Sequence, residues 1–462
     1  MSDTTIQAAT PEQDLLAAAA DASASGRFLW GSATASYQVE GSPHADGGGR
    51  CIWDEFSHTP GNVHNGDTGD VACDHYHRWP QDIELMKQIG IGAYRFSIRW
   101  PRVFPDGTGK INPKGIEFYD RIVDALLEAG ITPFVTLYHW DLPAALQRRG
   151  GWSNRDITDW FTEYAAAVTG ALGDRVTSWT TFNEPWVVAA LGHLYGVMAP
   201  GVKNIYANFD AVHNQLRAHS AAARMIKSTL SDAKVGIVLS NGGTFPATDS
   251  PEDIAAAELA HQWGNFPLFL DPLVKGHYPK ELEPRIQQFL PEGYENDLSD
   301  IQFTPDFVGL NYYFSNRMRH ADNWVGAEPI EEPDVAKTAM DWPIRPEGIH
   351  WLLKRAHEAY DLPSIYITEN GAAFDDVTDG VVVDDPDRVA YLDSHIRQVL
   401  KARDEGVPVD GYFVWSLLDN FEWAFGYDKR FGIIRVDYET QERIVKSSGH
   451  WYSHLAKAAA GS

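Results

Sequence analysis

Cysteine, basic residues and long apolar runs are all scarce in this sequence. Only two cysteines, Cys51 and Cys73, occur among 462 residues. A single pair cannot build a disulfide framework, so we expect reduced thiols and a cytoplasmic protein. No apolar run approaches the length of a transmembrane helix, and we therefore expect no membrane-spanning segment.

Positive charge is the second deficit. Lys and Arg number 38 against 64 Asp and Glu, which gives a formal net charge of −26. Binding of nucleic acid or of an anionic membrane surface requires a stripe of basic residues, and the sequence shows no such stripe. We therefore expect no nucleic-acid partner and no membrane partner, and we attribute the acidity to solubility.

Aromatic residues, by contrast, are abundant. They make up 12% of the chain and include 16 Trp. A large core would account for most of them. Aromatic faces also suit a sugar-binding cleft, because they stack on the apolar C–H face of a pyranose ring.

The first 26 residues differ in composition from the rest of the chain, being rich in Ala, Ser, Asp and Thr. They contain the apolar run 15–20, but Asp14 and Asp21 flank it and no Lys or Arg precedes it. This pattern favours a flexible or briefly helical N-terminal extension over a secretion signal. Because no Pro/Gly/Ser-rich linker divides the remainder, we expect residues 27–462 to form a single catalytic domain.

From residue 28 onward, short apolar runs alternate with amphipathic stretches. Eight strands and eight helices in alternation fit a single (β/α)8 TIM barrel of the α/β class better than a doubly wound sheet. Insertions at 41–78, 330–345 and 370–385 are expected to extend the βα loops into the walls of a deep pocket. The predicted strands are 28–36, 93–100, 133–140, 178–183, 234–240, 307–313, 364–369 and 411–418, and the predicted helices are 81–89, 113–129, 157–172, 209–229, 251–266, 346–360, 386–404 and 449–459.

A barrel places its functional residues at the carboxyl ends of its strands. Polar and aromatic residues do gather there in this sequence, and core packing alone does not explain them. Two are carboxylates, Glu184 after the fourth strand and Glu369 at the end of the seventh. Facing carboxylates are what glycoside hydrolysis requires, whereas the alternative is a pair of structural salt bridges, for instance with Arg95.

Several motifs in the same order resemble glycoside hydrolase family 1, in particular its bacterial β-glucosidases. The resemblance extends from about residue 28 to residue 454, which leaves only the N-terminal extension outside it. The motifs are Asn183-Glu184-Pro185, Ile367-Thr368-Glu369-Asn370-Gly371 and the stretches 28–41, 94–102, 193–196 and 417–423.

The resemblance implies a retaining β-glucosidase with Glu184 as general acid/base and Glu369 as nucleophile. Arg95 and the Tyr313 hydroxyl are suited to hold Glu369 ionised. Attack by Glu369 would form a covalent glycosyl-enzyme, and retention predicts carboxyl groups about 5–5.5 Å apart. We also expect Gly371 to let the chain leave the barrel without a side chain that crowds the sugar.

The resemblance further implies a set of substrate-binding residues and a substrate class. The expected substrates are small β-glycosides such as cellobiose, short cello-oligosaccharides and aryl or alkyl β-glucosides, with β-galactosidase and β-fucosidase side activity. The predicted binding residues are Gln38, His139, Trp140, Asn183, Asn311, Tyr313, Trp342, Trp415, Glu422, Trp423 and Phe431.

Two alternatives stay open at this point. A 6-phospho-β-glycosidase is disfavoured by Glu422, because its charge would repel a phosphate, although Lys429 lies nearby in the sequence. A barrel that binds sugar without chemistry would be expected to lack one of the two carboxylates. Glu184 itself argues for O-glycosides, because thioglucosidases of the family carry Gln at that position.

The stretch 73–77 combines Cys73, His75 and His77, but nothing else in the chain completes a set of zinc ligands. The family needs no metal, so we expect no metal and no cofactor, and we favour a structural role for this stretch. The residues leave the oligomeric state open, with a homo-oligomer among the alternatives.

Overall fold

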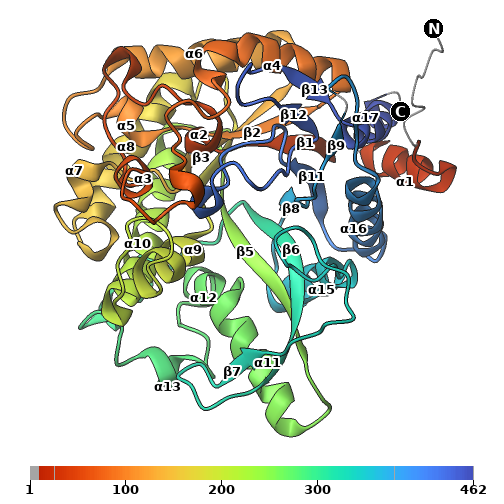
Figure 1. Ribbon diagram of the computed structural model, residues 1–462. Helices are drawn as coiled ribbons and strands as arrows, with labels where there is room; N and C mark the ends of the chain where they lie inside the picture. Colours follow the sequence, from red (N-terminus) through yellow and green to blue (C-terminus); the bar gives the residue numbers. More distant parts are fainter. Residues whose placement is uncertain (1–9, 25, 379, 461–462) are drawn as a thin grey trace, which may run out of the picture.

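Eight parallel strands close into a barrel at the centre of the computed structural model, which describes residues 10–24, 26–378 and 380–460 (Figure 1). The strands pair in the order β5-β4-β3-β2-β1-β11-β8-β6, and β6 pairs back with β5 to close the barrel. The predicted (β/α)8 barrel is therefore confirmed. The strands are β1 (Leu29–Ala33), β2 (Ala93–Ser97), β3 (Thr132–Tyr138), β4 (Ser178–Asn183), β5 (Lys234–Pro246), β6 (Phe307–His320), β8 (Ile365–Asn370) and β11 (Val409–Trp415).

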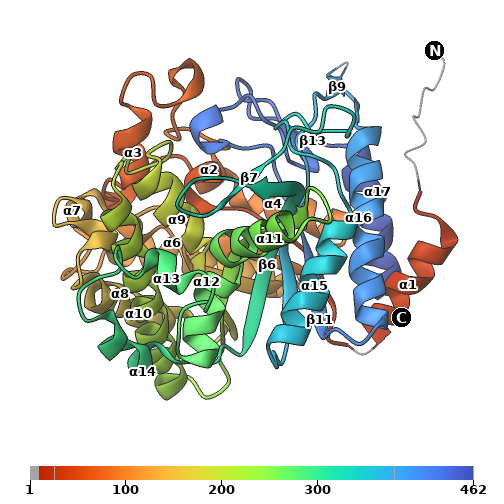
Figure 2. The same ribbon diagram turned by 90° about the horizontal axis from the view of Figure 1, so that it is seen from below.

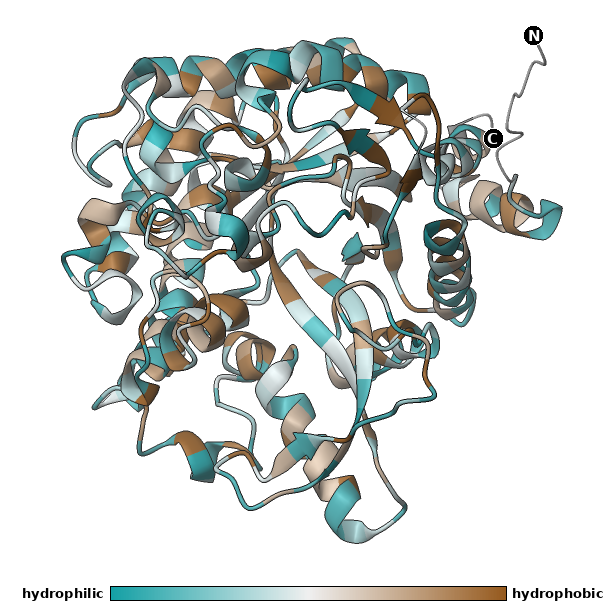
Figure 3. Cartoon of the chain, viewed as in Figure 1, coloured by the Kyte–Doolittle hydropathy of each residue, from teal (hydrophilic) through white to brown (hydrophobic). Residues whose placement is uncertain are grey.

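Helices surround the barrel, and Figure 3 shows that hydrophilic and hydrophobic residues alternate along them. In α6, for example, Phe118, Ile122 and Leu126 recur at helical spacing and are buried. None of the described helices is long and apolar enough to cross a membrane. The principal helices are α4 (His75–Ile89), α6 (Pro113–Glu128), α8 (Ile157–Leu172), α10 (Ile205–Thr229), α11 (Pro251–Gly264), α15 (Glu347–Ala359), α16 (Pro386–Asp404) and α17 (Ser447–Ala460).

Shorter elements lie in the connections. The short helices are α2 (Ser36–Val39), α3 (Ile52–Ser57), α5 (Trp100–Val103), α7 (Ala144–Gln147), α9 (Pro185–Ala189), α12 (Pro267–Leu270), α13 (Glu283–Ile286) and α14 (Leu298–Ile301). The short strands are β7 (Ala327–Pro329), β9 (Val377–Thr378), β10 (Val383–Asp384), β12 (Ile434–Val436) and β13 (Arg443–Val445).

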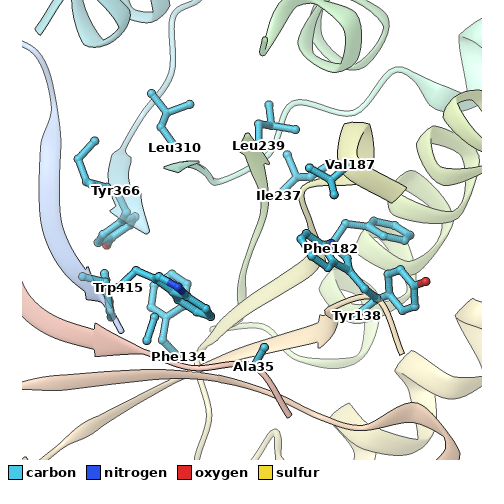
Figure 4. Close-up of a cluster of buried hydrophobic side chains, with 14 of the residues drawn as sticks. Ala35, Phe134, Tyr138, Phe182, Val187, Ile237, Leu239, Leu310, Tyr366 and Trp415 are labelled. Carbon is cyan, nitrogen blue, oxygen red and sulfur yellow. The ribbon is translucent and has the colours of Figure 1, made fainter. Parts of the chain in front are cut away.

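Aromatic rings fill the interior of the barrel, so that it is a packed core rather than a channel. Phe134 contacts Phe307, Tyr366 and Phe413 at ring-centroid distances of 5.2, 5.4 and 5.3 Å (Figure 4 labels Phe134 and Tyr366). Glycine makes room for these rings, because a Cβ at Gly31 would lie 2.4 Å from the Phe413 ring.

Two strands are longer than the sequence predicted. β5 and β6 continue past the rim to Pro246 and His320, paired in parallel through Met318, with a register shift between Asn241 and Gly243. The polar and glycine-rich composition of residues 240–244 conceals this extension, because such residues are typical of loops.

Helix α1 (Gln13–Ala24) lies within the predicted N-terminal extension. It packs beside α17 at the edge of the barrel, with Leu15, Ala19 and Ala22 buried (Figures 1 and 2). Arg397 of α16 pairs with the carboxylates of Glu12 and Asp14 at 3.0 and 2.8 Å. A helix is thus present in part of the extension, whereas residues 1–9 lie outside the described residues and their flexibility stays a prediction.

Candidate active site

The two carboxylates predicted to act together lie at the carboxyl end of the barrel. Glu369 is in β8 and Glu184 directly follows β4, and their residues are only 3% and 7% exposed. Asn311 of β6 joins them, because it is the register neighbour of Glu369 and its Nδ2 donates to Glu184 Oε1 at 2.9 Å. Parallel strand pairing therefore brings residues distant in sequence to one rim.

The backbone at this rim is unusual. Glu184, Trp140 and Trp423 all adopt positive φ values, of 49°, 76° and 51°. Such conformations are uncommon for bulky residues, and they tend to occur at functional sites where the surrounding structure holds them in place. Here the three residues follow three different strands, β4, β3 and β11, at the same rim of the barrel.

Glu369 sits between two strong hydrogen-bond donors. Arg95 Nη1 donates to its Oε1 at 2.7 Å, and the Tyr313 hydroxyl donates to its Oε2 at 2.7 Å. The same Arg95 is held in turn by Asn183, whose Oδ1 accepts from Nη2 at 2.6 Å. An ion pair and a hydroxyl of this kind stabilise a negative charge on Glu369.

Glu184 has a different environment. Its hydrogen-bond donor is a neutral amide, that of Asn311. Burial and the nearby charge of Glu369 raise the pKa of Glu184 to about 8. Burial also raises the pKa of Glu369, but Arg95 and Tyr313 oppose that rise, so the single negative charge of the pair rests on Glu369 while Glu184 keeps a proton.

Gln38, His139 and Asn183 form the polar part of the site. Gln38 Nε2 donates to Asn420 Oδ1 at 3.0 Å and to Glu422 Oε2 at 3.4 Å, while the buried Gln38 Oε1 accepts no bond. His139 Nε2 lies 3.0 Å from Asn183 Nδ2, and its buried Nδ1 has no partner. Burial holds the pKa of His139 well below its usual value, so the ring is neutral and can bond a hydroxyl.

Glu422 is the third carboxyl of the site. Burial, together with the nearby charge of Glu369, raises its pKa to about 8. Glu422 therefore carries a proton near neutral pH, and it can both donate to and accept from a hydroxyl group.

Aromatic rings form two walls of the site. Trp423 lies against Trp140 and His139, with ring centroids 4.4 and 6.0 Å apart, and Trp415 (labelled in Figure 4) stacks with His139 at 6.0 Å. On a second wall, the ring centroid of Trp342 is 5.3 Å from that of Tyr313 and 6.1 Å from that of Phe431.

The structure thus brings all the predicted site residues together through a continuous series of contacts. Sequence reasoning missed two further members, Thr368 and Asn420. Thr368 donates to Asn311 Oδ1 at 2.7 Å, and Asn420 accepts from Gln38. Both lie inside quoted motifs, but the contacts that give them a role join residues far apart in the chain.

The stretch that resembles metal ligands is engaged in structural contacts. His75 pairs with Asp82 at 2.8 Å, His77 pairs with Asp74 at 2.6 Å, and Cys73 Sγ donates to the Asp419 carbonyl at 2.9 Å. Across residues 10–24, 26–378 and 380–460, no group of three or more His, Cys, Asp or Glu side chains could hold a metal ion.

Comparison with known proteins agrees with this geometry. The sequence model described as "Glycosyl hydrolase family 1" matches residues 21–460. "Beta-glucosidase A" of Thermotoga maritima is 59% identical over 432 residues, which cover 93% of this chain and 97% of that protein. "1,4-beta-D-glucan glucohydrolase" of Thermotoga neapolitana is 58% identical over 431 residues, again 93% of this chain and 97% of the relative.

A more distant relative is "6-phospho-beta-galactosidase" of Clostridium acetobutylicum, 39% identical over 462 aligned positions that cover 93% of this chain and 96% of that protein. Among solved structures, "Family 1 b-glucosidase from Thermotoga maritima" superimposes with a TM-score of 0.92 at 58% identity, covering 94% of this chain and 98% of that one. The same enzyme in complex with deoxynojirimycin gives a TM-score of 0.93 at 58% identity and the same coverage.

Proposed function

Because this chain belongs to glycosyl hydrolase family 1, we propose that it is a retaining β-glucosidase that releases terminal non-reducing β-D-glucosyl residues. The proposed substrates are cellobiose, short cello-oligosaccharides and aryl or alkyl β-glucosides. The observation that carries the proposal is the unequal environment of two buried carboxyls in one site, a protonated Glu184 and an ionised Glu369.

In the first step, a carboxylate oxygen of Glu369 attacks the anomeric carbon while Glu184 donates its proton to the leaving oxygen. The bond to the aglycone breaks, and an ester bond forms between Glu369 and the sugar. Arg95 and Tyr313 support this step, because they keep Glu369 ionised and oriented before attack.

The second step uses the change of charge produced by the first. Glu369 is now a neutral ester and Glu184 has lost its proton, so the two no longer repel one another. Glu184 then accepts a proton from a water molecule, whose oxygen attacks the anomeric carbon and releases Glu369 as a carboxylate. Two displacements return the β-anomer, and proton transfer to Glu184 restores the starting state.

The sugar-binding role is proposed for residues whose polar atoms lack protein partners. The free acceptor of Gln38, the free ring nitrogen of His139 and the protonated Glu422 can each bond a sugar hydroxyl, and Trp415 provides an apolar floor. An axial or equatorial hydroxyl at C4 can meet Gln38 and Glu422, which supports side activity on β-galactosides and β-fucosides. The remaining proposed members are Trp140, Asn183, Asn311, Tyr313, Trp342, Trp423 and Phe431.

The phosphorylated-substrate alternative is less well supported. Burial and the nearby charge of Glu369 raise the pKa of Glu422 to about 8, so the repulsion of a phosphate would come from Glu369 rather than from Glu422 itself. A phosphate dianion placed beside Glu422 would meet the same unfavourable potential. The sugar-binding barrel without chemistry is also less well supported, because both carboxylates are present and linked through Asn311 and Arg95.

We further propose that the protein is cytoplasmic and that its partner is a small β-glycoside rather than nucleic acid or a membrane. Support comes from the two cysteines, which are unpaired and buried, and from the net charge of −26. A homo-oligomer remains one of the open alternatives.

The test is a substrate panel with the purified protein. We expect the highest kcat/KM for p-nitrophenyl β-glucoside, lower values for the β-galactoside and β-fucoside, and the lowest for the 6-phospho-β-glucoside. The first sugar released, followed by proton NMR before mutarotation, is expected to be the β-anomer. A preference for the phosphorylated sugar would contradict the assigned substrate, and release of the α-anomer would contradict the retaining mechanism.

A further inference from the structure

The loop formed by residues 419–432, here called the sugar loop, carries three proposed binding residues, Glu422, Trp423 and Phe431. It leaves the barrel after β11 and returns to β12, and its two ends lie side by side. Backbone hydrogen bonds join these two ends, here called the neck of the loop. The Asp419 N–H donates to the Ile434 carbonyl at 2.9 Å, and the Ile434 N–H donates to the Leu417 carbonyl at 3.0 Å.

A single carboxylate, that of Asp419, clamps the neck from inside. Its Oδ1 accepts from the Gly432 N–H at 3.0 Å, and its Oδ2 accepts from Arg430 Nη1 at 2.8 Å. The first residue of the sugar loop is therefore bonded to two residues at the opposite end of the loop. The side chain of Asp419 is fully buried, so water does not compete for these bonds.

Lys446, just ahead of α17, anchors this clamp to the rest of the protein. Its Nζ donates to Asp419 Oδ1 at 2.7 Å and to Asp376 Oδ2 at 2.6 Å, and its side chain is also fully buried. Asp376 pairs in turn with Arg388 of α16 at 3.0 Å. The cluster thus connects the sugar loop with the segment that follows β8, the strand of Glu369.

The geometry points to Asp419 as a positioning residue for sugar binding, an inference that rests on the proposed function. Asp419 holds the neck so that the next residue, Asn420, can accept from Gln38 at 3.0 Å and so that Glu422 stays beside Gln38, with its Oε2 3.4 Å from Gln38 Nε2. A carboxylate is suited to this task, since it receives donors from both ends of the loop and from Lys446 at once.

Asp419 stays ionised in this setting. Burial alone would raise its pKa, but the cations of Lys446, Arg430 and Arg388 lower the pKa below the ordinary value. The catalytic pair, by contrast, is held by Arg95, Asn311 and Tyr313, none of which belongs to the sugar loop. A loosened clamp should therefore weaken recognition of hydroxyl groups without changing the protonation of Glu184.

The experiment compares p-nitrophenyl β-glucoside with its 4-deoxy analogue in wild type and in Asp419→Asn. The ratio of the two kcat/KM values reports how strongly the site uses the 4-hydroxyl group. We expect a wild-type ratio of about 100 and a ratio about tenfold smaller in the variant, because Gln38 and Glu422 no longer hold that group in place. The pH above which activity declines should be the same in both proteins.

Lys446→Met is the second variant, and it decides the outcome if Asp419→Asn does not fold. It keeps the unbranched chain up to the position of Cε, removes the ammonium group, and is expected to lower the ratio in the same direction. The control is Asp297→Asn. Asp297 also pairs with three basic side chains, those of Arg155, His213 and Arg217, but it lies outside the sugar loop and its anchors.

The control is expected to lower Tm while leaving the ratio at the wild-type value. A ratio within about twofold of wild type in both Asp419→Asn and Lys446→Met would overturn the inference, since the clamp would then serve stability alone. A similar fall in the control would also overturn it, because the effect would not be specific to the sugar loop. A wild-type protein that hydrolyses neither glucoside would refute the proposed function itself and, with it, this inference.

Discussion

The active site has a strand-borne half and a loop-borne half, and the two are organised differently. Arg95, Asn311, Tyr313 and Glu369 lie within barrel strands, and both oxygens of Glu369 are already hydrogen-bonded. Gln38, His139 and Glu422 lie beyond the strand ends, and two of them keep a buried polar atom without a partner. In the half proposed to perform chemistry, the carboxylate of Glu369 is thus already held at both oxygens, and only Arg95 Nε lacks a partner, whereas the proposed binding half keeps an acceptor of Gln38 and a ring nitrogen of His139 for the substrate.

The largest effect is expected from Glu369→Ala, which removes the central residue of the strand-borne half. No covalent intermediate can form, so kcat for p-nitrophenyl β-glucoside should fall by about 10⁴-fold or more. Steady-state kinetics with an unchanged circular dichroism spectrum would check this. Undiminished activity would remove Glu369 from the role of nucleophile and reverse the roles of the two halves.

Arg95→Met is expected to have the next largest effect. Arg95 joins Glu369 to Asn183 through bonds of 2.7 and 2.6 Å, and without it the carboxylate loses both a counter-charge and its orientation. We expect kcat to fall about 10²- to 10³-fold. Arg397→Met, which removes an ion pair with α1 on the surface, is the matched control, and it should leave kcat unchanged. Equal losses in the two variants would indicate that Arg95 acts on stability alone.

Gly371→Ala tests the close contact between Trp415 and the residue that follows β8, the strand of Glu369. A Cβ at Gly371 would lie 1.7 Å from the carbonyl oxygen of Trp415, so either the end of β8 or the backbone at Trp415 must move. Gly371 therefore leaves room for the backbone of Trp415, whereas the sequence suggested that it leaves room for the sugar. We expect a loss of about 1–3 kcal/mol in the free energy of unfolding, measured by urea denaturation. Gly264→Ala, where an added Cβ has no close neighbour, should not share this loss.

The pH dependence is expected to be the smallest effect. Glu184, the proposed acid, can donate only while protonated, and its pKa is raised to about 8. The value of kcat/KM should therefore be near its maximum well below that pH, fall to half near it and decline further as the proton is lost. One pH unit above the midpoint, about a tenth of the activity should remain. Measuring the profile in Glu422→Gln separates the two carboxyls that share this raised pKa. If the decline of kcat/KM at alkaline pH disappears in Glu422→Gln, that decline reports the titration of Glu422 and not of Glu184.

The sequence predicted the strand-borne half far better than the loop-borne half, for a physical reason. A strand end is a local signal. A short apolar run that leads to Glu369 and Gly371, or a run rich in Thr and aromatic residues that leads to Glu184 and Pro185, can be recognised without knowledge of the fold. Parallel pairing then places such ends at one rim. The expected positions of Glu184 and Glu369 followed from signals of this kind, and the barrel itself followed from the alternation of eight strands with eight helices.

The loop-borne half depends on contacts between residues far apart in the chain. Gln38 donates to Asn420, which lies 382 positions further along the chain, and no periodicity in either segment predicts that contact. The resemblance to a known family located Gln38 and Glu422, but it did not reveal the Asp419 clamp. The packing of α1 and the extension of β5 and β6 were missed for the same reason, since tertiary contacts decide whether such short segments are ordered.

The most direct test of this division of roles is to trap the intermediate. Incubation with 2,4-dinitrophenyl 2-deoxy-2-fluoro-β-glucoside, followed by proteolysis and mass spectrometry, should show one added fluoroglucosyl group on the peptide that contains Glu369, and no label in Glu369→Ala. Labelling of Glu184, or complete turnover with no label on any carboxylate, would contradict the assignment of Glu369 as the nucleophile of a retaining enzyme.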